Sequence, residues 1–179
     1  MGGSLGAHRL NELASAAFVA LHQKRPQLRM THLTGFADEK SVRLFYEKKG
    51  APAVVHAFMK DMAPLYQSAH LALCRSGAAT CAELSAFGVP SLMVPYPFAT
   101  HDHQMANARA MEKAGAADVV PEKDLSETWL AEYLEGCLSN PERLQKMRAG
   151  AWARAGRGGT KALADLVTKT ALGGGVDPA

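Results

Sequence analysis

Residues 71–94 read LALCRSGAATCAELSAFGVPSLMV and have the pattern of a strand, a helix and a second strand. Residues 71–74 are apolar, and in 91–94 three apolar residues follow Ser91. Both runs are short enough to be buried strands. Between them, residues 78–87 have the pattern of a helix that stops at Gly88, where helices commonly end. Strands joined through a helix pair in parallel. This stretch therefore predicts an α/β fold around a parallel sheet.

The same alternation continues in both directions along the chain. Further strands are expected at 28–34, 53–58 and 117–120. Further helices are expected over 10–21, 39–49, a short stretch from about Asp61, 103–114, a stretch striped by Leu130 and Leu134, a stretch starting at Asn140-Pro141, and a final one after Gly158-Gly159. This order predicts a doubly wound, Rossmann-like parallel sheet, whose ligands bind beyond the carboxyl ends of the strands.

Length and composition describe one ordinary globular domain. The chain has 179 residues, of which 47% are hydrophobic and 21% charged, and its net charge of +3 is too small to indicate nucleic-acid binding. The three cysteines are odd in number and two of them lie in apolar patterns, which favours free thiols in a reducing compartment. No signal peptide and no apolar run of roughly 20 residues is present. We therefore expect a cytosolic protein, or one that is peripheral on a membrane.

Two glycine-containing loops lead into helices and are candidate phosphate sites. The first is Gly2–Ala7, in which Gly3 and Gly6 allow close backbone approach and Ser4 offers a hydroxyl. The second contains Arg75, Ser76, Gly77, Ala78, Ala79 and Thr80. Amides at a helix start attract phosphate, although such loops are also found as simple tight turns. The first loop should follow a strand, yet only Met1 precedes it, so the chain is expected to lack its first strand.

Glu83 follows the second loop on the same predicted helix face as Thr80. A carboxylate can accept two hydrogen bonds from a ribose diol, as the acidic residue of dinucleotide sites does. The alternative is a solvated glutamate on an ordinary capped helix. Two phosphate-type loops in one small domain favour the nucleotide interpretation.

Two further segments complete the candidate site. The proline-bent loop from Pro95 to Asn107, which contains His103 and Gln104, suits recognition of sugar hydroxyls. Phe58-Met59 at a strand end forms either a base-binding slot or part of the core. His101, Asp102 and His103 do not converge on one helix face, and no Asp-x-Asp motif is present, so neither a metal nor another cofactor is expected.

Together these segments resemble the C-terminal domain of the MurG family, the GT-B transferases that make lipid II in peptidoglycan synthesis. The resembling stretches are Gly2–Ala7 with Asn11, Phe58–Met62, Arg75–Thr80 with Glu83, Gly88–Pro90, Val94–Pro97 and His103–Ala108. Their order and spacing match from Gly2 to about Leu172. The resemblance implies inverting transfer of GlcNAc from UDP-GlcNAc to a lipid-linked acceptor, which converts lipid I to lipid II at the cytoplasmic face of the inner membrane.

The resemblance also assigns roles to single residues. It implies that Ser4 and Thr80, with the amides of Ala78 and Ala79, contact the phosphates. The Met59 backbone would contact the uracil edge beside Phe58, and Glu83 would hold the ribose diol. Gln104 and His103 would contact GlcNAc hydroxyls, and Arg75 would close the nucleotide side. His103 stands where some relatives have a second glutamine.

By this interpretation residues 1–172 are the donor-binding C-terminal half of a GT-B enzyme and residues 173–179 a disordered tail. No catalytic residue is expected in the chain, because the acceptor site and the general base belong to an N-terminal domain of the family. The domain alone is expected to bind UDP-GlcNAc weakly or not at all, and not to turn it over. The alternatives are the donor subunit of a two-chain GlcNAc transferase, a non-catalytic nucleotide-sugar-binding module, and a relative of the galactolipid synthases.

Overall fold

A computed structural model describes residues 7–99, 102–156, 164–165 and 167–168. The predicted loop residues Gly3, Ser4 and Gly6 lie outside these ranges, and so does the predicted tail at 173–179. Of the predicted final helix, the four residues described at 164–165 and 167–168 are helical.

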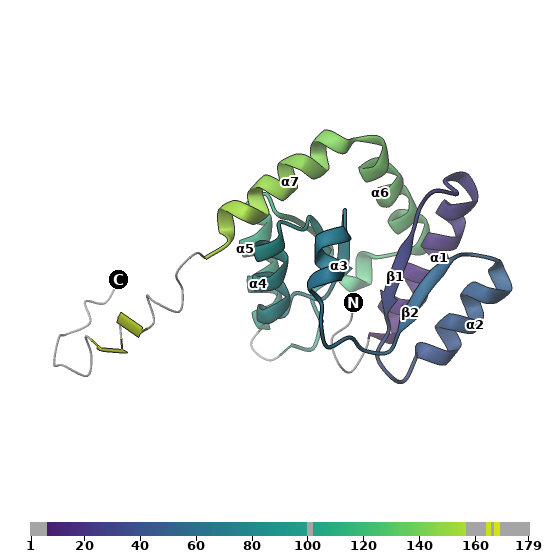
Figure 1. The fold of residues 1–179 in the computed structure, drawn as a ribbon, viewed down its shortest axis with the longest axis horizontal. Coiled ribbons are helices and arrows are strands. Elements are labelled where there is room, and N and C mark those ends of the chain that lie inside the picture. Colours follow the sequence, from purple (N-terminus) through teal and green to yellow (C-terminus); the bar gives the residue numbers. More distant parts are fainter. Residues whose placement is uncertain (1–6, 100–101, 157–163, 166, 169–179) are drawn as a thin grey trace.

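The chain alternates between helices and strands as its sequence predicts (Figure 1). The helices are α1 (His8–Lys24), α2 (Glu39–Lys49), α3 (Ala63–Ser68), α4 (Ala78–Phe87), α5 (His103–Lys113), the 3₁₀ turn η2 (Glu122–Asp124), α6 (Glu127–Ser139) and α7 (Pro141–Arg154). The strands are β1 (Met30–Leu33), β2 (Ala53–His56), β3 (Ala72–Cys74), β4 (Ser91–Met93) and β5 (Ala117–Val119). Each strand is slightly shorter than predicted.

Within the described residues all strand pairs are parallel, but the strands form two sheets rather than one. β1 pairs with β2, and β3, β4 and β5 form a second sheet in that order. α1 joins the two sheets, because its first half packs with residues of β4 and its second half packs with residues of α2 and β2. The parallel α/β architecture is therefore confirmed.

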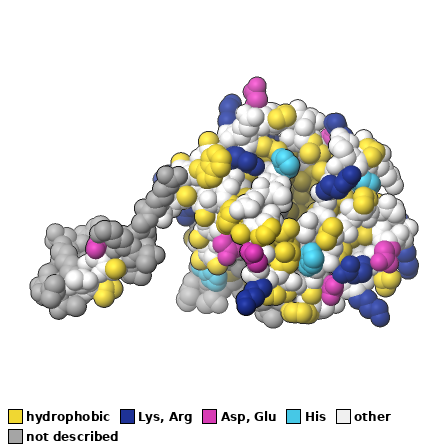
Figure 2. Space-filling view, viewed as in Figure 1, with side chains coloured by type: hydrophobic (Ala, Val, Ile, Leu, Met, Phe, Trp, Pro, Cys, Tyr) yellow, Lys and Arg dark blue, Asp and Glu magenta, His cyan; other side chains and the backbone are white. Residues whose placement is uncertain are grey.

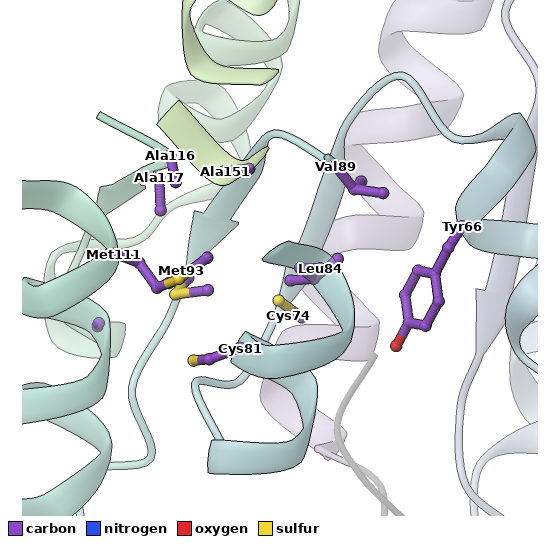
Figure 3. Close-up of a cluster of buried hydrophobic side chains, with 11 residues drawn as sticks. Tyr66, Cys74, Cys81, Leu84, Val89, Met93, Met111, Ala116, Ala117 and Ala151 are labelled. Atoms are coloured by element: carbon purple, nitrogen blue, oxygen red, sulfur yellow. The ribbon is translucent and has the colours of Figure 1, made fainter. Parts of the chain in front are cut away.

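The three-stranded sheet is covered on both faces, as a doubly wound fold requires. Met93 in β4 packs into a cluster with Leu84 of α4 and Met111 of α5 (Figure 3). Its neighbours Leu92 and Val94 point the other way, into a cluster formed by α1 and α6. Because successive side chains of a strand alternate between faces, this short strand is buried completely.

The two-stranded sheet buries one face only. Val55 packs with Phe18 of α1 and Tyr46 of α2 on the covered face. On the opposite face Thr31 and its register partner Val54 are exposed, with 56% of Val54 accessible. The doubly wound prediction therefore describes the three-stranded sheet well and the β1–β2 sheet only in part.

Candidate functional site

The predicted site segments lie where parallel strands end. Phe58-Met59 follows β2, Arg75–Gly77 joins β3 to α4, and the 95–102 loop joins β4 to α5. The carboxyl ends of β3 and β4 lie side by side, because Cys74 pairs with Met93. The strands thus bring the 75–77 and 95–102 segments to one edge of the sheet, the usual place for a ligand in this architecture.

Ser76 ties the second glycine loop to the start of α5. Its hydroxyl is fully buried and donates to the Gln104 carbonyl at 2.7 Å. The side-chain amide of Asn107 donates to the Ser76 carbonyl at 3.0 Å. The hydroxyl bonds to backbone here, and the prediction that it faces an anion stays a prediction. Ser76 fixes the spacing between the two loops.

Gln104 also bonds within the protein. Its side-chain oxygen accepts from the Tyr96 amide at 3.0 Å, which ties the start of α5 to the segment after β4. His103 is exposed at the first turn of α5. Asp102, just before it, has a left-handed backbone conformation with φ of 54°, which is rare for a residue other than glycine. His103 is thus accessible beside Gln104, which holds residue 96.

Arg75 is a buried residue that supports this loop from beneath. Its guanidinium donates to the carbonyls of Val94 and Pro95 at 3.1 and 3.2 Å and forms an ion pair with Glu122. It also lies under the Tyr96 ring, 5.5 Å from the ring centroid. With 8% of its surface exposed, Arg75 holds the backbone after β4 and does not present its charge to solvent. Its predicted contact with a nucleotide stays a prediction.

The start of α4 leaves its amides free of side-chain capping. Gly77 is the N-cap residue and supplies no side chain, and Ala78 and Ala79 are exposed. Thr80 is half-buried beside them. The first-turn amides of a helix carry the positive end of its dipole and have no partner within the helix. This helix start can therefore accept an anionic group.

Glu83 lies one turn further along α4 and is held by a tyrosine. The Tyr66 hydroxyl donates to Glu83 Oε2 at 2.7 Å. Glu83 is otherwise exposed, whereas only 5% of Tyr66 is exposed. The second carboxylate oxygen, Oε1, is on the exposed side chain one turn from the uncapped amides. A diol bound at this position would find a carboxylate already oriented.

Phe58 is an exposed aromatic residue, which favours a binding slot over the core. Its exposed fraction is 56%, and Met59 is half-buried. The end of β1 runs alongside, because the Gly35 amide donates to the Ala57 carbonyl. Phe36 follows Gly35 and is 74% exposed. Two accessible aromatic residues therefore stand at neighbouring strand ends.

A groove of about 1100 Å³ runs along the other face of α4. Its walls include Ala78, Cys81 and Ser85 of α4 and Trp152 of α7. Residues 78, 81 and 85 share one helix face, and Thr80 and Glu83 lie on another. The groove adjoins the candidate site at Ala78 and at Asn107, whose side chain bonds to the Ser76 carbonyl. We place the site on the Glu83 side, because the oriented carboxylate and the uncapped amides lie there.

The surface has charges of both signs. Figure 2 shows Lys, Arg, Asp and Glu side chains interspersed with hydrophobic ones on the face seen in Figure 1. Within the described residues, no three His, Cys, Asp or Glu side chains come close enough to hold a metal ion. In the same part of the chain, no helix is long and apolar enough to cross a membrane. All three cysteines are free and buried. The prediction that no metal or cofactor takes part is not tested by these findings.

The sequence alone did not reveal two residues of this edge. Glu122 follows β5 at the same carboxyl edge, and an acidic residue just after a predicted strand is a signal that could have identified it. Tyr66 had no such signal, because an apolar helix of six residues is compatible with simple core packing. Only its contact with Glu83 in the structure distinguishes Tyr66 from an ordinary core residue.

Comparison with known proteins agrees with this architecture. The glycosyltransferase family 28 C-terminal domain matches residues 1–168. A protein from Syntrophus aciditrophicus, named UDP-N-acetylglucosamine--N-acetylmuramyl-(pentapeptide) pyrophosphoryl-undecaprenol N-acetylglucosamine transferase, is 40% identical over 166 residues, which are 93% of this chain and 45% of that protein. The protein of the same name from Hahella chejuensis is 45% identical over 148 residues, 82% of this chain and 41% of that protein. The chain spans about half the length of the curated relatives it matches.

Solved structures give the same result. The crystal structure of Acinetobacter baumannii MurG superposes with a TM-score of 0.80 at 32% identity and covers 94% of this chain and 48% of that chain. The glycosyltransferase VinC in complex with dTDP has a TM-score of 0.63 at 19% identity over 93% of this chain and 40% of that chain, a likeness of fold alone. These matches confirm both the resemblance that the motifs indicate and the predicted fold class.

Proposed function

Since this chain belongs to the glycosyltransferase family 28 C-terminal domain family, we propose that it binds the UDP-GlcNAc donor of an inverting GlcNAc transferase. The relatives are named as transferases of N-acetylglucosamine from UDP-N-acetylglucosamine, which supports the choice of donor. The observation that carries the proposal is the start of α4. Its uncapped amides and the oriented Glu83 carboxylate lie one turn apart, the arrangement that a phosphate and a ribose diol require.

Each part of a nucleotide sugar has a counterpart at this edge. The diphosphate would bind at the amides of Ala78 and Ala79 and the hydroxyl of Thr80, with Ser4 in the first glycine loop. The ribose diol would bind Glu83 Oε1. The uracil would lie beside Phe58, its edge against the Met59 backbone. The GlcNAc group would face His103 and the 96–104 loop.

The chemistry of transfer explains why amides belong at this position. When the bond between the anomeric carbon and UDP breaks, negative charge grows on the β-phosphate. Fixed N–H groups directed at that charge stabilise the transition state, by about 2–4 kcal/mol for each well-placed donor. The α4 start provides such donors without rearrangement, and its helix dipole acts in the same direction. The described residues therefore act on the leaving group.

The acceptor and its activation are assigned to residues beyond these 179. The relatives are about twice as long as this chain, and their names include an undecaprenol-linked acceptor. We propose that a second unit, in the same polypeptide or in a partner, binds this lipid-linked acceptor and supplies the base, and that lipid II is the product. A lipid-linked acceptor also implies a peripheral location at the cytoplasmic face of the inner membrane.

Calorimetry tests donor binding directly. The chain is titrated with UDP-GlcNAc, and separately with UDP-glucose and UDP-galactose. We expect UDP-GlcNAc to bind most tightly, and we expect Glu83→Ala to weaken binding at least about tenfold, since a charged hydrogen-bond acceptor is removed. Glu112→Ala is the matched control, because Glu112 pairs with Arg109 on the surface of α5. No heat from any of the three donors would refute the proposal.

A transfer assay tests the division of labour. Radiolabelled UDP-GlcNAc and a lipid-linked acceptor are incubated with the chain, with and without the acceptor-binding half of a relative. We expect transfer only in the presence of that half. Robust transfer by the chain alone would contradict the assignment of the base to another unit. Tight donor binding without transfer in either mixture would instead identify a nucleotide-sugar-binding module.

A further inference from the structure

Tyr66 is a buried residue that none of the predicted contacts with the donor uses. Its ring belongs to the core cluster beneath α4 and stands beside the turn that carries Cys81 and Leu84 (Figure 3). The ring also lies against Phe87, with centroids 5.5 Å apart. Its hydroxyl leaves this apolar environment and donates to Glu83 Oε2 at 2.7 Å. The Tyr66 side chain thus extends from the core to Glu83, the residue proposed to bind the ribose.

We propose that Tyr66 is a positioning residue that fixes the Glu83 carboxylate for a ribose diol. The proposal rests on the proposed function and extends it to the choice between ribosides and deoxyribosides. Tyr66 occupies one carboxylate oxygen, which leaves Oε1 to receive the diol. A donor without the 2′-hydroxyl would gain little from a carboxylate held in this orientation.

The physical basis is preorganisation. An exposed glutamate samples many rotamers, and a ligand that immobilises it loses about 0.5–1.5 kcal/mol of binding free energy. The Tyr66 ring is already fixed by packing, so its O–H group fixes the carboxylate before a ligand arrives. Burial, together with the hydrogen bond to Glu83, raises the pKa of the Tyr66 hydroxyl well above its ordinary value. The hydroxyl therefore stays protonated and donates throughout the neutral range.

The position of Tyr66 also connects the two ends of a bound nucleoside. It lies on α3, the short helix that follows the Phe58-Met59 segment. The carboxylate of Asp61 accepts from the Ala63 amide at 3.1 Å at the start of this helix. α3 thus runs from the candidate base slot to the carboxylate of Glu83.

The test compares the binding of UDP and 2′-deoxy-UDP to the full chain by calorimetry. We expect the chain to prefer UDP, and we expect Tyr66→Phe to weaken UDP binding roughly two- to tenfold with little effect on 2′-deoxy-UDP. Tyr133→Phe is the matched control. Tyr133 is a half-buried tyrosine that also donates to a carboxylate, Asp118 Oδ2 at 2.6 Å, but between α6 and β5. It should lower stability without changing the preference for UDP.

Two further variants separate positioning from a structural effect. In a Glu83→Ala background, Tyr66→Phe should no longer change UDP affinity, because the two residues act through one contact. Glu83→Asp keeps the charge but shortens the side chain, so we expect it to reduce the preference for UDP over 2′-deoxy-UDP, as Tyr66→Phe does. This variant provides the measurement if Tyr66→Phe folds poorly.

The outcomes distinguish the two proposals. Equal weakening of both nucleotides by Tyr66→Phe, or no weakening of either, overturns the positioning role and leaves donor binding intact. Failure of the unaltered chain to bind UDP at all overturns the proposed function, and the positioning role with it.

Discussion

His32 is the centre of a buried hydrogen-bond chain whose protonation state the geometry fixes. Asn11 donates through its side-chain amide nitrogen to the Thr34 carbonyl and to Asp38, so its oxygen is left to accept. His32 Nε2 therefore carries the proton and donates to that oxygen at 3.1 Å. The other ring nitrogen, Nδ1, accepts from the Tyr46 hydroxyl at 2.9 Å. A neutral imidazole satisfies this chain, and an imidazolium would not.

This arrangement predicts a loss of stability on mild acidification. Burial lowers the pKa of His32 from 6.5 to about 3. Below pH 6.5 His32 is protonated in the unfolded chain but stays neutral in the folded chain. The free energy of unfolding therefore falls as the pH drops toward 3. Between pH 7 and pH 5 the loss is about 2 kcal/mol. Urea unfolding of the chain and of His32→Gln at both pH values measures it.

Comparing the pH dependence of the free energy of unfolding between the chain and His32→Gln separates the effect of His32 from that of other titratable groups. Asp38 raises the pKa of His8, whose contribution to stability is present below pH 6.5 and fades as the pH rises, the opposite sign. His8 is retained in the variant, so its effect cancels in the comparison. Parallel pH profiles for the chain and His32→Gln would contradict the assignment.

Arg75 supports the 95–104 loop through backbone contacts, which gives a second prediction at this scale. Arg75→Met leaves the Val94 and Pro95 carbonyls and the Glu122 carboxylate without their shared donor. We expect the free energy of unfolding to fall by about 2–4 kcal/mol, because this ion pair is largely shielded from water. Glu122→Gln should cost less, and the double variant should cost less than the sum of the two. Additive costs in chemical denaturation would contradict the shared contact.

At the scale of elements, two helical glycines differ in the space available for an added side chain. A Cβ on Gly150 in α7 would lie 2.4 Å from the Ala114 carbonyl oxygen, whereas a Cβ on Gly136 in α6 would meet nothing within 4 Å. We expect Gly136→Ala to stabilise the protein by about 0.5–1 kcal/mol, from helix propensity alone. Gly150→Ala should destabilise it by about 1–3 kcal/mol, because backbone must move. Thermal unfolding of both variants shows whether the signs differ.

Helices were predictable at this scale because their signals are local. The ends of α4 at Ala78 and Phe87 match the prediction, since Gly88 has a left-handed conformation with φ of 65°. Asn140 caps α7 by accepting from the Arg143 amide, as its sequence indicates. Strand ends were less predictable. The backbone ladder after β1 continues to Gly35, beyond the assigned strand, because pairing depends on a partner that is distant in the sequence.

The same distinction between local and distant contacts explains which site residues could be predicted. Glu83 and the loop before α4 were identified, because a helix start and a carboxylate one turn later are signals within one segment. The contacts of Ser76 with Gln104 and of Arg75 with Glu122 join separate segments, so their structural roles could not be read from the chain. Both side chains were expected to face a ligand, and both bond within the protein.

At the scale of the whole molecule, α1 links two sheets that differ in how far they are buried from solvent. The central strand β4 of the three-stranded sheet is buried on both faces, whereas Thr31 and Val54 leave one face of the β1–β2 sheet exposed. Leu10 and Leu13 of α1 pack with the first sheet, and Phe18 packs with the second. Because each sheet has its own ladder, β1 and β2 can separate without breaking a bond between β3 and β4. The molecule is therefore expected to open in two steps.

Native-state hydrogen exchange tests this order of opening. Amides of β1 and β2 should exchange through an opening of lower free energy than those of β3 and β4. Phe18→Ala removes a side chain that is 2% exposed and meets Tyr46 edge to face, so it should lower protection of β1 and β2 alone. Leu130→Ala in α6 acts on the cluster under the three-stranded sheet, where α1 also docks, so it should lower protection in both sheets. An equal loss in both sheets from Phe18→Ala would mean a single cooperative unit, in which α1 transmits every perturbation across the molecule.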